Sequence, residues 1–547
     1  LSDWHRVIQQ AQLDMSVLAK DITAALDRLP RGATSISGIA ENIADAIERG
    51  WVYGSLLYGD SVVRSGYLLV GMLKTRNLRN ALVAISRQFE RLKVEELSDA
   101  LPKLVAGSPE DGPGDVLGVE AVGRIGSAPE LATGMMLVVG VLGLVASAFF
   151  FFTKTDTFAY SWLFAIFFTF TFCVGGVFWI MLHAASNSSW GVAIRRLWEN
   201  LANMVVILGL LASPLLIPAV NKHLYEWMNH HRDAAHPAAE HGGTVKEALH
   251  HMSHDNPHLH ILYSKFGYLN ISNHFIPPFS WQTRFVLYFL ILGYIARVMR
   301  KKSLAQEQDG DIKHTISSRQ FSCRWLLFFA LTSTFAAVDW LMSLDYSWFS
   351  TMWGVYIFAG SAWSSMALTI LLVTWLKSLG YLQKVVTEEH YHLMGKLLFA
   401  FTVFWAYIAF SQYFLIWYAN ITEETRFYLT RNTEGWRGVS IFIVVGHFIA
   451  PFLALLSQAR KKKPYVMVFV CLWVIFMHLV DMYWNVIPER GPSLGIGWWV
   501  DGAWIQDVAA LLGVFGTMGF LFLRGLSKYS LYPWRDPRLI ESVNVIN

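Results

Sequence analysis

The run YSWLFAIFFTFTFCVGGVFWIMLH, residues 160–183, decides the fold, because it holds 24 consecutive residues without one Asp, Glu, Lys or Arg. A helix of about 20 residues rising 1.5 Å per residue crosses a hydrocarbon core of about 30 Å. Nine further apolar runs follow the same rule. The ten predicted spans are about 134–152, 160–183, 203–220, 283–299, 325–344, 352–376, 397–418, 439–457, 465–484 and 503–523. The sequence therefore predicts an all-α, polytopic membrane protein with about ten transmembrane helices.

Proline inside two of these runs does not argue against a span. Pro214 lies in the third run and Pro451 in the eighth. In a membrane bundle, neighbouring helices can satisfy the backbone groups that a proline frees. We therefore expect both runs to cross the bilayer as helices.

The composition agrees with a membrane protein and excludes several other classes. Of the 547 residues, 54% are hydrophobic and only 15% are charged, whereas soluble domains carry about 25% charged residues. A net charge of +4 is too small to indicate a nucleic-acid partner. The three cysteines, Cys173, Cys323 and Cys471, are scattered singly. This excludes a disulfide framework, a zinc ribbon, a cysteine-ligated iron–sulfur cluster and a CxxCH haem attachment.

The distribution of Lys and Arg predicts the orientation in the membrane. Even-numbered loops and the C-terminal tail hold about 20 of these residues, against about 10 in the odd-numbered loops. The positive-inside rule then places both termini on the cytoplasmic side of a bacterial cytoplasmic (inner) membrane. We expect a membrane domain over 134–525, an outward loop over 221–282 and a cytoplasmic tail over 526–547.

The outward loop is rich in histidine. Eleven of the 18 histidines of the chain lie within 221–282. Imidazole is a common ligand of zinc, copper and nickel, so the loop is a candidate for metal capture. The candidate ligands are His230, His231, His250, His251 and His254. No pair repeats a recognisable ligand spacing beside a cysteine or carboxylate. A docking loop with an incidental histidine bias therefore remains the alternative.

Ionisable side chains within the spans are candidates for function, because each is costly to hold in a bilayer. The proton-route candidates are Asp339, Asp345, Gln412, His447, His478, Asp481 and Asp507. His478 and Asp481 are three residues apart on one helix face, which predicts that they pair. Such a pair could pass a proton or bind a quinol hydroxyl. The alternative is a polar contact that holds helices together. No residue is assigned as catalytic.

The first 112 residues differ from the rest, because they are amphipathic with a helical period. Their segments include Leu26–Gly32, Ser65–Leu73 and Leu78–Leu82. These residues resemble the N-terminal domain of Clp-type unfoldases, most closely the ClpV type. The chain holds no GxxxxGK[ST] motif, so no ATPase motor follows. We expect either a truncated or joined reading frame, or a fused protein–protein docking domain, over 1–112 with a linker over 113–133.

Several motifs of the membrane part recur in order and carry a second resemblance. They are Trp340–Thr351, Gly395–Phe401, Phe410–Asn420, Gly446–Phe448 with Pro451–Phe452, Asp481–Trp484 with Pro488, and Asp536–Ser542. Residues 134–547 resemble the ActF family, the smaller NrfD-like membrane subunits of alternative complex III. That complex is a bacterial quinol:cytochrome c (or other acceptor) oxidoreductase.

The ActF resemblance implies a fold, partners and cofactors. It implies two four-helix bundles with two additional helices, beside a larger NrfD-like membrane subunit. It also implies multihaem cytochrome c and iron–sulfur subunits outside the lipid bilayer, and menaquinol or ubiquinol as the electron donor of the complex. The c-type haems and iron–sulfur clusters would belong to those partners, and this chain would bind no cofactor. Electron transport in a respiratory chain would then pass through the neighbours.

One departure from the related subunits bears on quinol oxidation. In the larger NrfD-like subunit, quinol oxidation is associated with a His on an early helix. A downstream Arg-x-x-Glu motif sets the alignment, and Arg196–Glu199 matches that motif here. That alignment places the His near Val174–Gly176, where this chain has no ionisable group. The sequence thus predicts a subunit that supports quinol oxidation by its partners, with either proton translocation or conformational coupling. A secondary or metal-ion transporter is the alternative, while a haem–copper oxidase would need more histidines within the spans.

Overall fold

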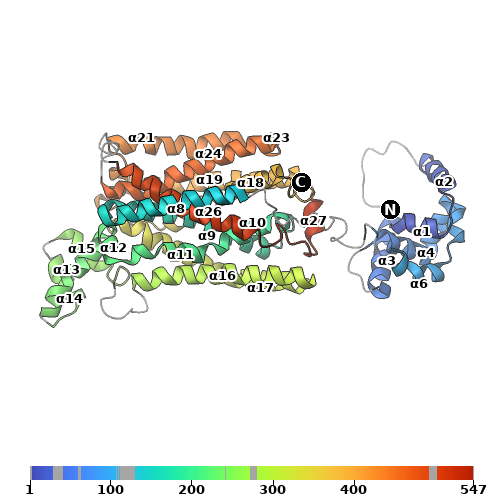
Figure 1. Cartoon of the computed structure of the whole chain (residues 1–547), viewed down its shortest axis with the longest axis horizontal. Helices are drawn as coiled ribbons and strands as arrows, with labels where there is room; N and C mark the ends of the chain where they lie inside the picture. Colours follow the sequence, from blue (N-terminus) through green and yellow to red (C-terminus); the bar gives the residue numbers. More distant parts are fainter. Residues whose placement is uncertain are drawn as a thin grey trace. The chain divides into compact units, whose positions relative to one another are not determined.

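The structure, a computed structural model, describes residues 3–28, 41–58, 63–105, 108, 110, 130–240, 242–254, 256–271, 280–491 and 502–545. Over these residues the chain forms helices and no strands, which confirms the all-α prediction. The chain divides into two compact units, Leu1–Val122 (unit 1) and Gly123–Asn547 (unit 2), and each is described by itself (Figure 1).

Unit 1 is a small helical domain packed around its fourth helix. Its elements are α1 (Asp3–Gln10), α2 (Met15–Asp27), α3 (Glu41–Tyr58), α4 (Ser65–Lys74), α5 (Arg76–Ile85), the 3₁₀ turn η1 (Arg87–Arg91) and α6 (Val94–Val105). Leu69, Val70 and Leu73 of α4 are buried against Val7 of α1 and Leu101 of α6. Burying side chains of this size stabilises a fold by about 1.5–3 kcal/mol each, so α4 holds unit 1 together.

A buried ion pair closes the core of unit 1. Arg64 Nε lies 2.9 Å from Asp3 Oδ2, and both side chains are buried. Arg64 Nη2 also donates to Ser108 Oγ at 2.9 Å and to the carbonyl of Val105 at 3.1 Å. The pair therefore ties the start of α1 to the end of α6.

Unit 2 is a bundle of long apolar helices. Among the described residues, nine helices are long and apolar enough to cross a membrane. They are α8 (Glu130–Thr153), α9 (Thr155–Ala185), α16 (Trp281–Asp309), α17 (Lys313–Trp340), α18 (Trp353–Ser378), α19 (Glu388–Ala419), the helix of α21 (Glu434–Ile443), η6 (Val444–Ile449) and α22 (Ala450–Leu455), α24 (Pro464–Val486) and α26 (Ala503–Leu526). The run over 160–183 forms most of α9, whose most apolar 18 residues are all buried inside the bundle.

The third predicted span, 203–220, is not one continuous helix, so the prediction of ten unbroken spans is wrong here. The chain forms α10 (Arg195–Asn203), α11 (Val205–Leu211), η4 (Ser213–Leu216) and α12 (Pro218–Leu224). Pro214 and Pro218 lack the N–H that a helix needs. In the 3₁₀ turn that follows, the N–H of Leu215 bonds to Ala212 and not to Leu211, whose carbonyl accepts from Trp162 Nε1 at 3.0 Å. The broken segment still packs along α9 and α16.

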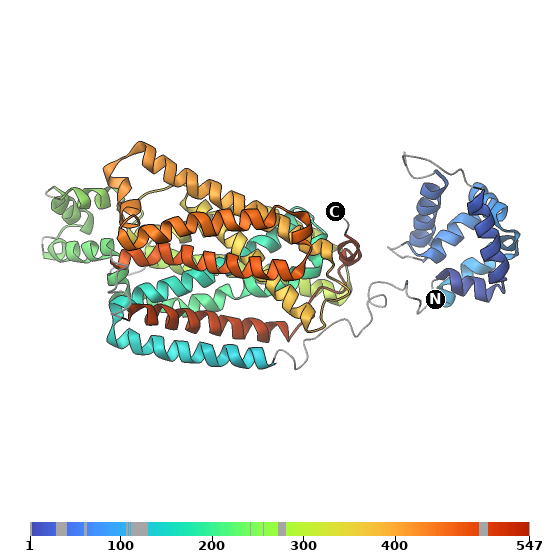
Figure 2. The same cartoon turned by 90° about the horizontal axis from the view of Figure 1, so that it is seen from above.

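Short elements gather at the two ends of this bundle (Figure 2). The His-rich loop forms α13 (Glu226–Glu240), α14 (Val245–Ser253) and α15 (Pro257–Ser264) at one end. The C-terminal tail ends in α27 (Leu539–Val543) at the other end, which we call the tail end. Connecting pieces are η3 (Trp190–Ile194), η5 (Met342–Leu344), α20 (Thr422–Thr430), α23 (Gln458–Lys461) and η7 (Ile487–Arg490).

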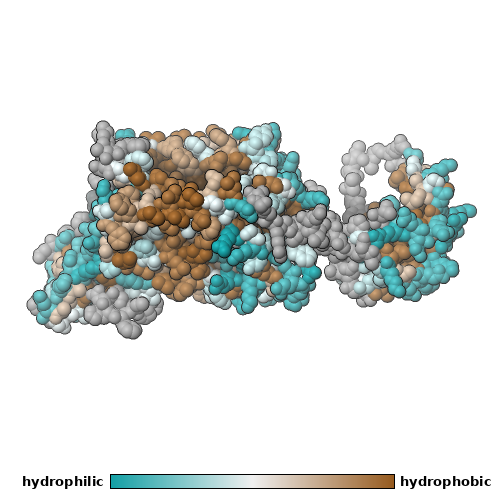
Figure 3. Space-filling view, viewed as in Figure 1, coloured by the Kyte–Doolittle hydropathy of each residue, from teal (hydrophilic) through white to brown (hydrophobic). Residues whose placement is uncertain are grey.

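The surface of unit 2 has the polarity of a membrane-spanning bundle. Apolar side chains gather across its middle, and hydrophilic side chains gather toward its two ends (Figure 3). Helix α8 illustrates this, because Leu131 and Phe152 are 76% and 81% exposed. Only a narrow glycine face of α8 is buried, where Gly140 and Gly143 meet Gly513 and Gly516 of α26. Small residues of this kind let two helices in lipid approach closely.

Candidate functional site

Three of the predicted proton-route residues lie together in the core of unit 2. His447 comes from η6, and His478 and Asp481 come from α24. One ligand atom from each lies within 4.8 Å of the other two, and all three side chains are fully buried. Within the described part of the chain, no other group of three His, Cys, Asp or Glu side chains converges in this way. We call these residues the His–His–Asp cluster.

The backbone around His447 widens into a π-helical turn. Pro451 has no N–H to donate to the carbonyl of His447, four residues earlier, and the N–H of Ala450 bonds to Val445 instead. The imidazole of His447 lies between two indoles, with ring centroids 4.0 Å from Trp363 and 3.6 Å from Trp405. Single π-helical turns of this kind are frequent at functional sites.

His478 is held in one tautomer by a hydroxyl. Thr171 of α9 donates its hydroxyl proton to the carbonyl of Phe168 at 2.7 Å. Its oxygen therefore accepts from His478 Nε2, 2.8 Å away. Neutral His478 then carries its lone pair on Nδ1, and this buried atom has no hydrogen-bond partner. The sequence predicted a hydrogen-bonded pair of His478 with Asp481, but His478 Nε2 bonds to Thr171 instead.

Asp481 is hydrogen-bonded through one oxygen only. Oδ1 accepts from the hydroxyl of Tyr356 and, at 3.3 Å, from Asn485 Nδ2. Oδ2 has no hydrogen bond of ordinary geometry, although the indole of Trp405 also interacts with this carboxylate, and His447 Nε2 lies 3.8 Å from Oδ2. Neither nitrogen of His447 has a hydrogen-bond partner either. The three converging side chains thus carry unsatisfied ring nitrogens and one unsatisfied carboxylate oxygen, although most buried polar groups in proteins are satisfied.

The other candidate carboxylates of the spans are fully engaged. Arg284 forms a two-pronged pair with Asp339, with Nε–Oδ2 at 2.7 Å and Nη2–Oδ1 at 2.9 Å, and Tyr288 also donates to this carboxylate. Arg490 pairs with Asp507 at 2.9 and 3.2 Å in the same way. These arrangements are those of structural ion pairs between helices.

Asp345 and Gln412 lie apart from the His–His–Asp cluster in local networks. Asp345 accepts from the backbone and the hydroxyl of Ser347. Gln412 accepts from Ser350 Oγ at 2.8 Å and donates to the hydroxyl of Tyr428 at 3.3 Å. Both residues fasten the connection between α17 and α18.

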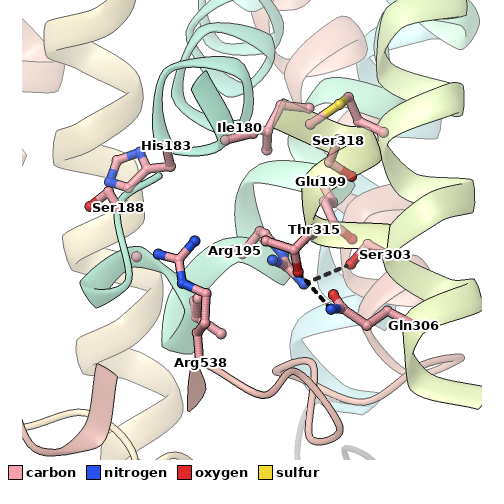
Figure 4. A pocket seen from close by; sticks show the side chains of 14 residues that line it. Ile180, His183, Ser188, Arg195, Glu199, Ser303, Gln306, Thr315, Ser318 and Arg538 are labelled. Atoms are coloured by element: carbon pink, nitrogen blue, oxygen red, sulfur yellow. Dashed lines mark hydrogen bonds and ion pairs between the residues drawn. The ribbon is translucent and has the colours of Figure 1, made fainter. Parts of the chain in front are cut away.

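A pocket of about 40 Å³ opens at the tail end of the bundle (Figure 4). Its lining combines apolar side chains with polar ones, which include His183, Arg195, Glu199, Ser303, Gln306, Thr315, Ser318 and Arg538. Arg195 Nη2 donates to Ser303 Oγ at 3.2 Å. A pocket of this size with several polar side chains can hold a few water molecules.

A line of buried hydroxyls on α18 lies between the His–His–Asp cluster and this pocket. Its members are Ser361, Ser364, Ser365 and Thr369, and all are at most 1% exposed. Trp179 donates to Ser365 at 3.1 Å, and Trp198 donates to Thr369 at 3.0 Å. From Tyr356 to Thr369 the helix rises about 20 Å. His183, which lines the pocket, lies within ring-contact distance of both indoles.

The histidines of the outward loop do not converge on one point in its described residues. His231 is 2% exposed and stacks on Phe266 with centroids 5.0 Å apart, and burial lowers the pKa of His231 to about 4. His250 lies against His251, His254 and Tyr263 as a ring cluster. His230 Nε2 lies 3.7 Å from Glu226 Oε1.

Sequence reasoning missed the residues that complete the His–His–Asp cluster. Asn485 follows Asp481 by four residues on α24, so helical spacing could have found it. Tyr356, Trp405 and Thr171 reach the cluster from three other helices, and no spacing in the sequence connects them to it. Their contribution depends on how the helices pack.

The fold and the cluster define an all-helical protein in which a bundle of membrane-type helices follows a small helical unit. No family model matches the chain. The chain is 48% identical over 135 residues to the AAA+ ATPase ClpV1 of Pseudomonas aeruginosa, which covers 25% of this chain and 14% of ClpV1. It is 40% identical over 109 residues to the chaperone protein ClpB of Yersinia enterocolitica, covering 20% of this chain and 12% of ClpB.

One solved structure is also similar in sequence. It comes from work on the coevolution of the ATPase ClpV, the TssB–TssC sheath and the accessory HsiE protein in type VI secretion, with 52% identity and a TM-score of 0.20. The match covers 20% of this chain and 68% of that one. The similarity to ClpV and ClpB lies in the N-terminal region, and the predicted Clp resemblance there is confirmed. The chain spans less than a sixth of either curated relative.

These comparisons correct two expectations drawn from the motifs of the membrane part. The names of the relatives point to Clp-type ATPases and type VI secretion, and not to alternative complex III or a respiratory chain. The partner named with the solved structure is the TssB–TssC sheath, and not a larger NrfD-like subunit, a multihaem cytochrome or an iron–sulfur protein. Aromatic and apolar residues are common in all membrane spans, so motifs built from them did not suffice to assign a complex.

Proposed function

We propose that unit 2 is an integral membrane subunit that passes protons through its helix bundle, with the His–His–Asp cluster as the central proton carrier. One observation carries the proposal. Asp481 Oδ2 is buried without a hydrogen bond and faces His447, and no Lys or Arg among the described residues pairs with it. A buried carboxylate without a cation is costly, which favours a group that takes up and releases a proton.

The chemistry requires a proton to move between Asp481 and His447. Their facing atoms, Oδ2 and Nε2, are 3.8 Å apart, so a small approach or one water molecule would join them. The hydroxyl of Tyr356 holds the other oxygen of the carboxylate in place. The two indoles that enclose His447 would stabilise its protonated form through cation–π attraction.

The route from the cluster toward the tail end would follow the buried hydroxyls of α18. Each of these hydroxyls donates to a backbone carbonyl of α18, so it would rotate away from that carbonyl to pass a proton to a neighbouring water. The tail-end pocket, with His183 in its lining, would supply protons to this line. Under the positive-inside rule the pocket would face the cytoplasm of a bacterium.

Proton flux through the full-length chain in liposomes tests the proposal. A K⁺ gradient with valinomycin drives the flux, and a trapped pH-sensitive dye reports it. We expect Asp481→Asn and His447→Gln to lower the flux by about tenfold or more, because general acid–base groups contribute about 10²–10⁴-fold to the transfers that they assist. Asp311→Asn, at an exposed turn between α16 and α17, is the matched control and keeps the flux. A wild-type flux in Asp481→Asn contradicts the proposal.

For unit 1 we propose a role as a protein-docking domain, favoured by its 48% identity to part of ClpV1. Binding of the full-length chain to a TssB–TssC sheath tests this role. Peptide mapping by mass spectrometry tests whether units 1 and 2 form one native chain. A single peptide spanning Gly112 to Met135 from cells supports a fused docking domain, whereas its absence beside peptides from both units supports a joined reading frame.

A further inference from the structure

The His–His–Asp cluster also has the donor atoms of a transition-metal site. Two imidazoles and one carboxylate form a common ligand set for zinc, cobalt and iron dications. All three side chains are fully buried, and the ligand atoms lie within 4.8 Å of one another. His447 Nε2, His478 Nδ1 and Asp481 Oδ2 have no hydrogen-bond partner. Each would therefore lose no protein hydrogen bond on binding a cation.

The second ring nitrogen of His478 makes the kind of hydrogen bond that a metal-bound histidine makes. Ligating histidines almost always donate their other ring N–H to an oxygen, which fixes the tautomer. His478 Nε2 donates to Thr171, whose own proton is engaged by the carbonyl of Phe168. The lone pair on His478 Nδ1 is thereby fixed toward the interior.

The spacing of the other two ligands suits one small cation. Tetrahedral zinc with bonds of about 2.0–2.1 Å holds its ligand atoms about 3.4 Å apart. His447 Nε2 and Asp481 Oδ2 are 3.8 Å apart, so a shift of a few tenths of an ångström would bring both within bonding distance. Asp481 Oδ1 is held by Tyr356 and Asn485, which leaves Oδ2 as the ligand.

We propose that the His–His–Asp cluster binds one divalent transition-metal cation through His447 Nε2, His478 Nδ1 and Asp481 Oδ2. Nitrogen ligands select zinc, cobalt or nickel over Mg²⁺ and Ca²⁺. The cation neutralises the buried carboxylate and satisfies both imidazoles at once. Metal binding at this site does not require the proton flux proposed above. A bound cation and a carried proton would, however, compete for the same three atoms.

Titration with Co²⁺ and Zn²⁺ tests the site. The probe is the full-length chain in lipid nanodiscs, stripped of metal with a chelator, and visible absorption reports Co²⁺ while calorimetry reports Zn²⁺. We expect one high-affinity ion per chain with a tetrahedral Co²⁺ spectrum. We expect His478→Gln and Asp481→Asn to weaken metal binding by about 100-fold or more. Loss of a group that only hydrogen-bonds to a ligand already weakens binding by about 10–100-fold.

The outward loop supplies the matched control. A variant with His250, His251 and His254 all changed to Gln removes the ring cluster of that loop and leaves the bundle unchanged, so it keeps the high-affinity ion. Loss of the ion in this variant and its retention in Asp481→Asn would overturn the proposal, as would the absence of a high-affinity ion in the wild-type chain. His478→Cys guards against misfolding, because a thiolate ligand adds a sulfur-to-cobalt charge-transfer band that a merely structural His478 would not give.

Proton flux measured on the same metal-free chain separates this inference from the proposed function. Flux in the metal-free chain, together with no high-affinity ion in the titration, leaves the proton route standing and removes the metal site. A tightly bound ion without any flux does the reverse.

Discussion

Asp339 and Asp481 are both buried acids in the same helix bundle, yet their surroundings are opposite. The two oxygens of Asp339 are matched by the guanidinium of Arg284, which spans α16 and α17. Asp481 has the hydroxyl of Tyr356 on one oxygen and the imidazole of His447 near the other. The first carboxylate is paired as in a structural joint, whereas the second keeps one oxygen available for a proton or a cation.

The contrast teaches how to sort ionisable residues within membrane spans. Burial alone does not identify function, because Asp339, Asp481 and Asp507 are all less than 5% exposed. A guanidinium within hydrogen-bonding distance holds a carboxylate in place, as Arg490 does for Asp507. A carboxylate whose nearest basic group is histidine can change its charge. A structural carboxylate and a functional one therefore differ in the basic residue beside them, arginine or histidine, and not in their burial.

The largest expected effect comes from breaking the Asp339 pair. Arg284→Met leaves Asp339 buried without a cation, and we expect a loss of about 3–5 kcal/mol in the free energy of unfolding. Denaturant unfolding in nanodiscs measures it. The double variant Arg284→Met with Asp339→Leu removes both charges and should recover most of the loss. A single variant as stable as the wild type would show that the pair is not a structural joint.

His231 of the outward loop offers the same comparison for imidazoles. It is buried without an acid beside it, and burial lowers its pKa to about 4. The unfolded loop therefore binds a proton more readily, so stability from neutral His231 is complete above about pH 6.5 and is lost as the pH falls toward 4. We expect α13–α15 to lose up to about 3 kcal/mol of local stability over that window.

Amide hydrogen exchange of α13–α15 between pH 7 and pH 4 measures this loss, after correction for the intrinsic rates. His231→Phe removes the proton and keeps a ring against Phe266, so its protection should depend less on pH. Equal pH dependence in the variant and the wild type would assign the effect to the exposed histidines of the loop.

The sequence predicted where the apolar helices lie but not how two proline-containing runs differ. Pro451 stands alone in its run, and the helix absorbs it by widening into the π-helical turn at His447. Pro214 and Pro218 are four residues apart, so two successive turns lack a donor and the segment breaks into α11, η4 and α12. Spacing between prolines was visible in the sequence and would have predicted the break.

The candidate site was predictable only in its same-helix part. His478 and Asp481 share a face of α24, and their burial follows from the apolar run around them. Which atoms they contact depends on α9 and α18, because Thr171 takes the ring nitrogen that a local pair would have used. Contacts between helices distant in sequence are set by packing, and periodicity carries no information about them.

The smallest expected change in stability is at Asp481 itself, and it sharpens the comparison most. Asp481→Asn keeps a hydrogen-bond acceptor for Tyr356 and removes a carboxylate that no cation balances. We therefore expect the free energy of unfolding to change by about 1 kcal/mol or less, while proton flux or Co²⁺ binding is lost. Denaturant unfolding beside the flux and titration measurements checks this. A loss as large as in Arg284→Met would show that Asp481 stabilises the fold as Asp339 does. The two buried acids would then have different hydrogen-bond partners but the same structural role.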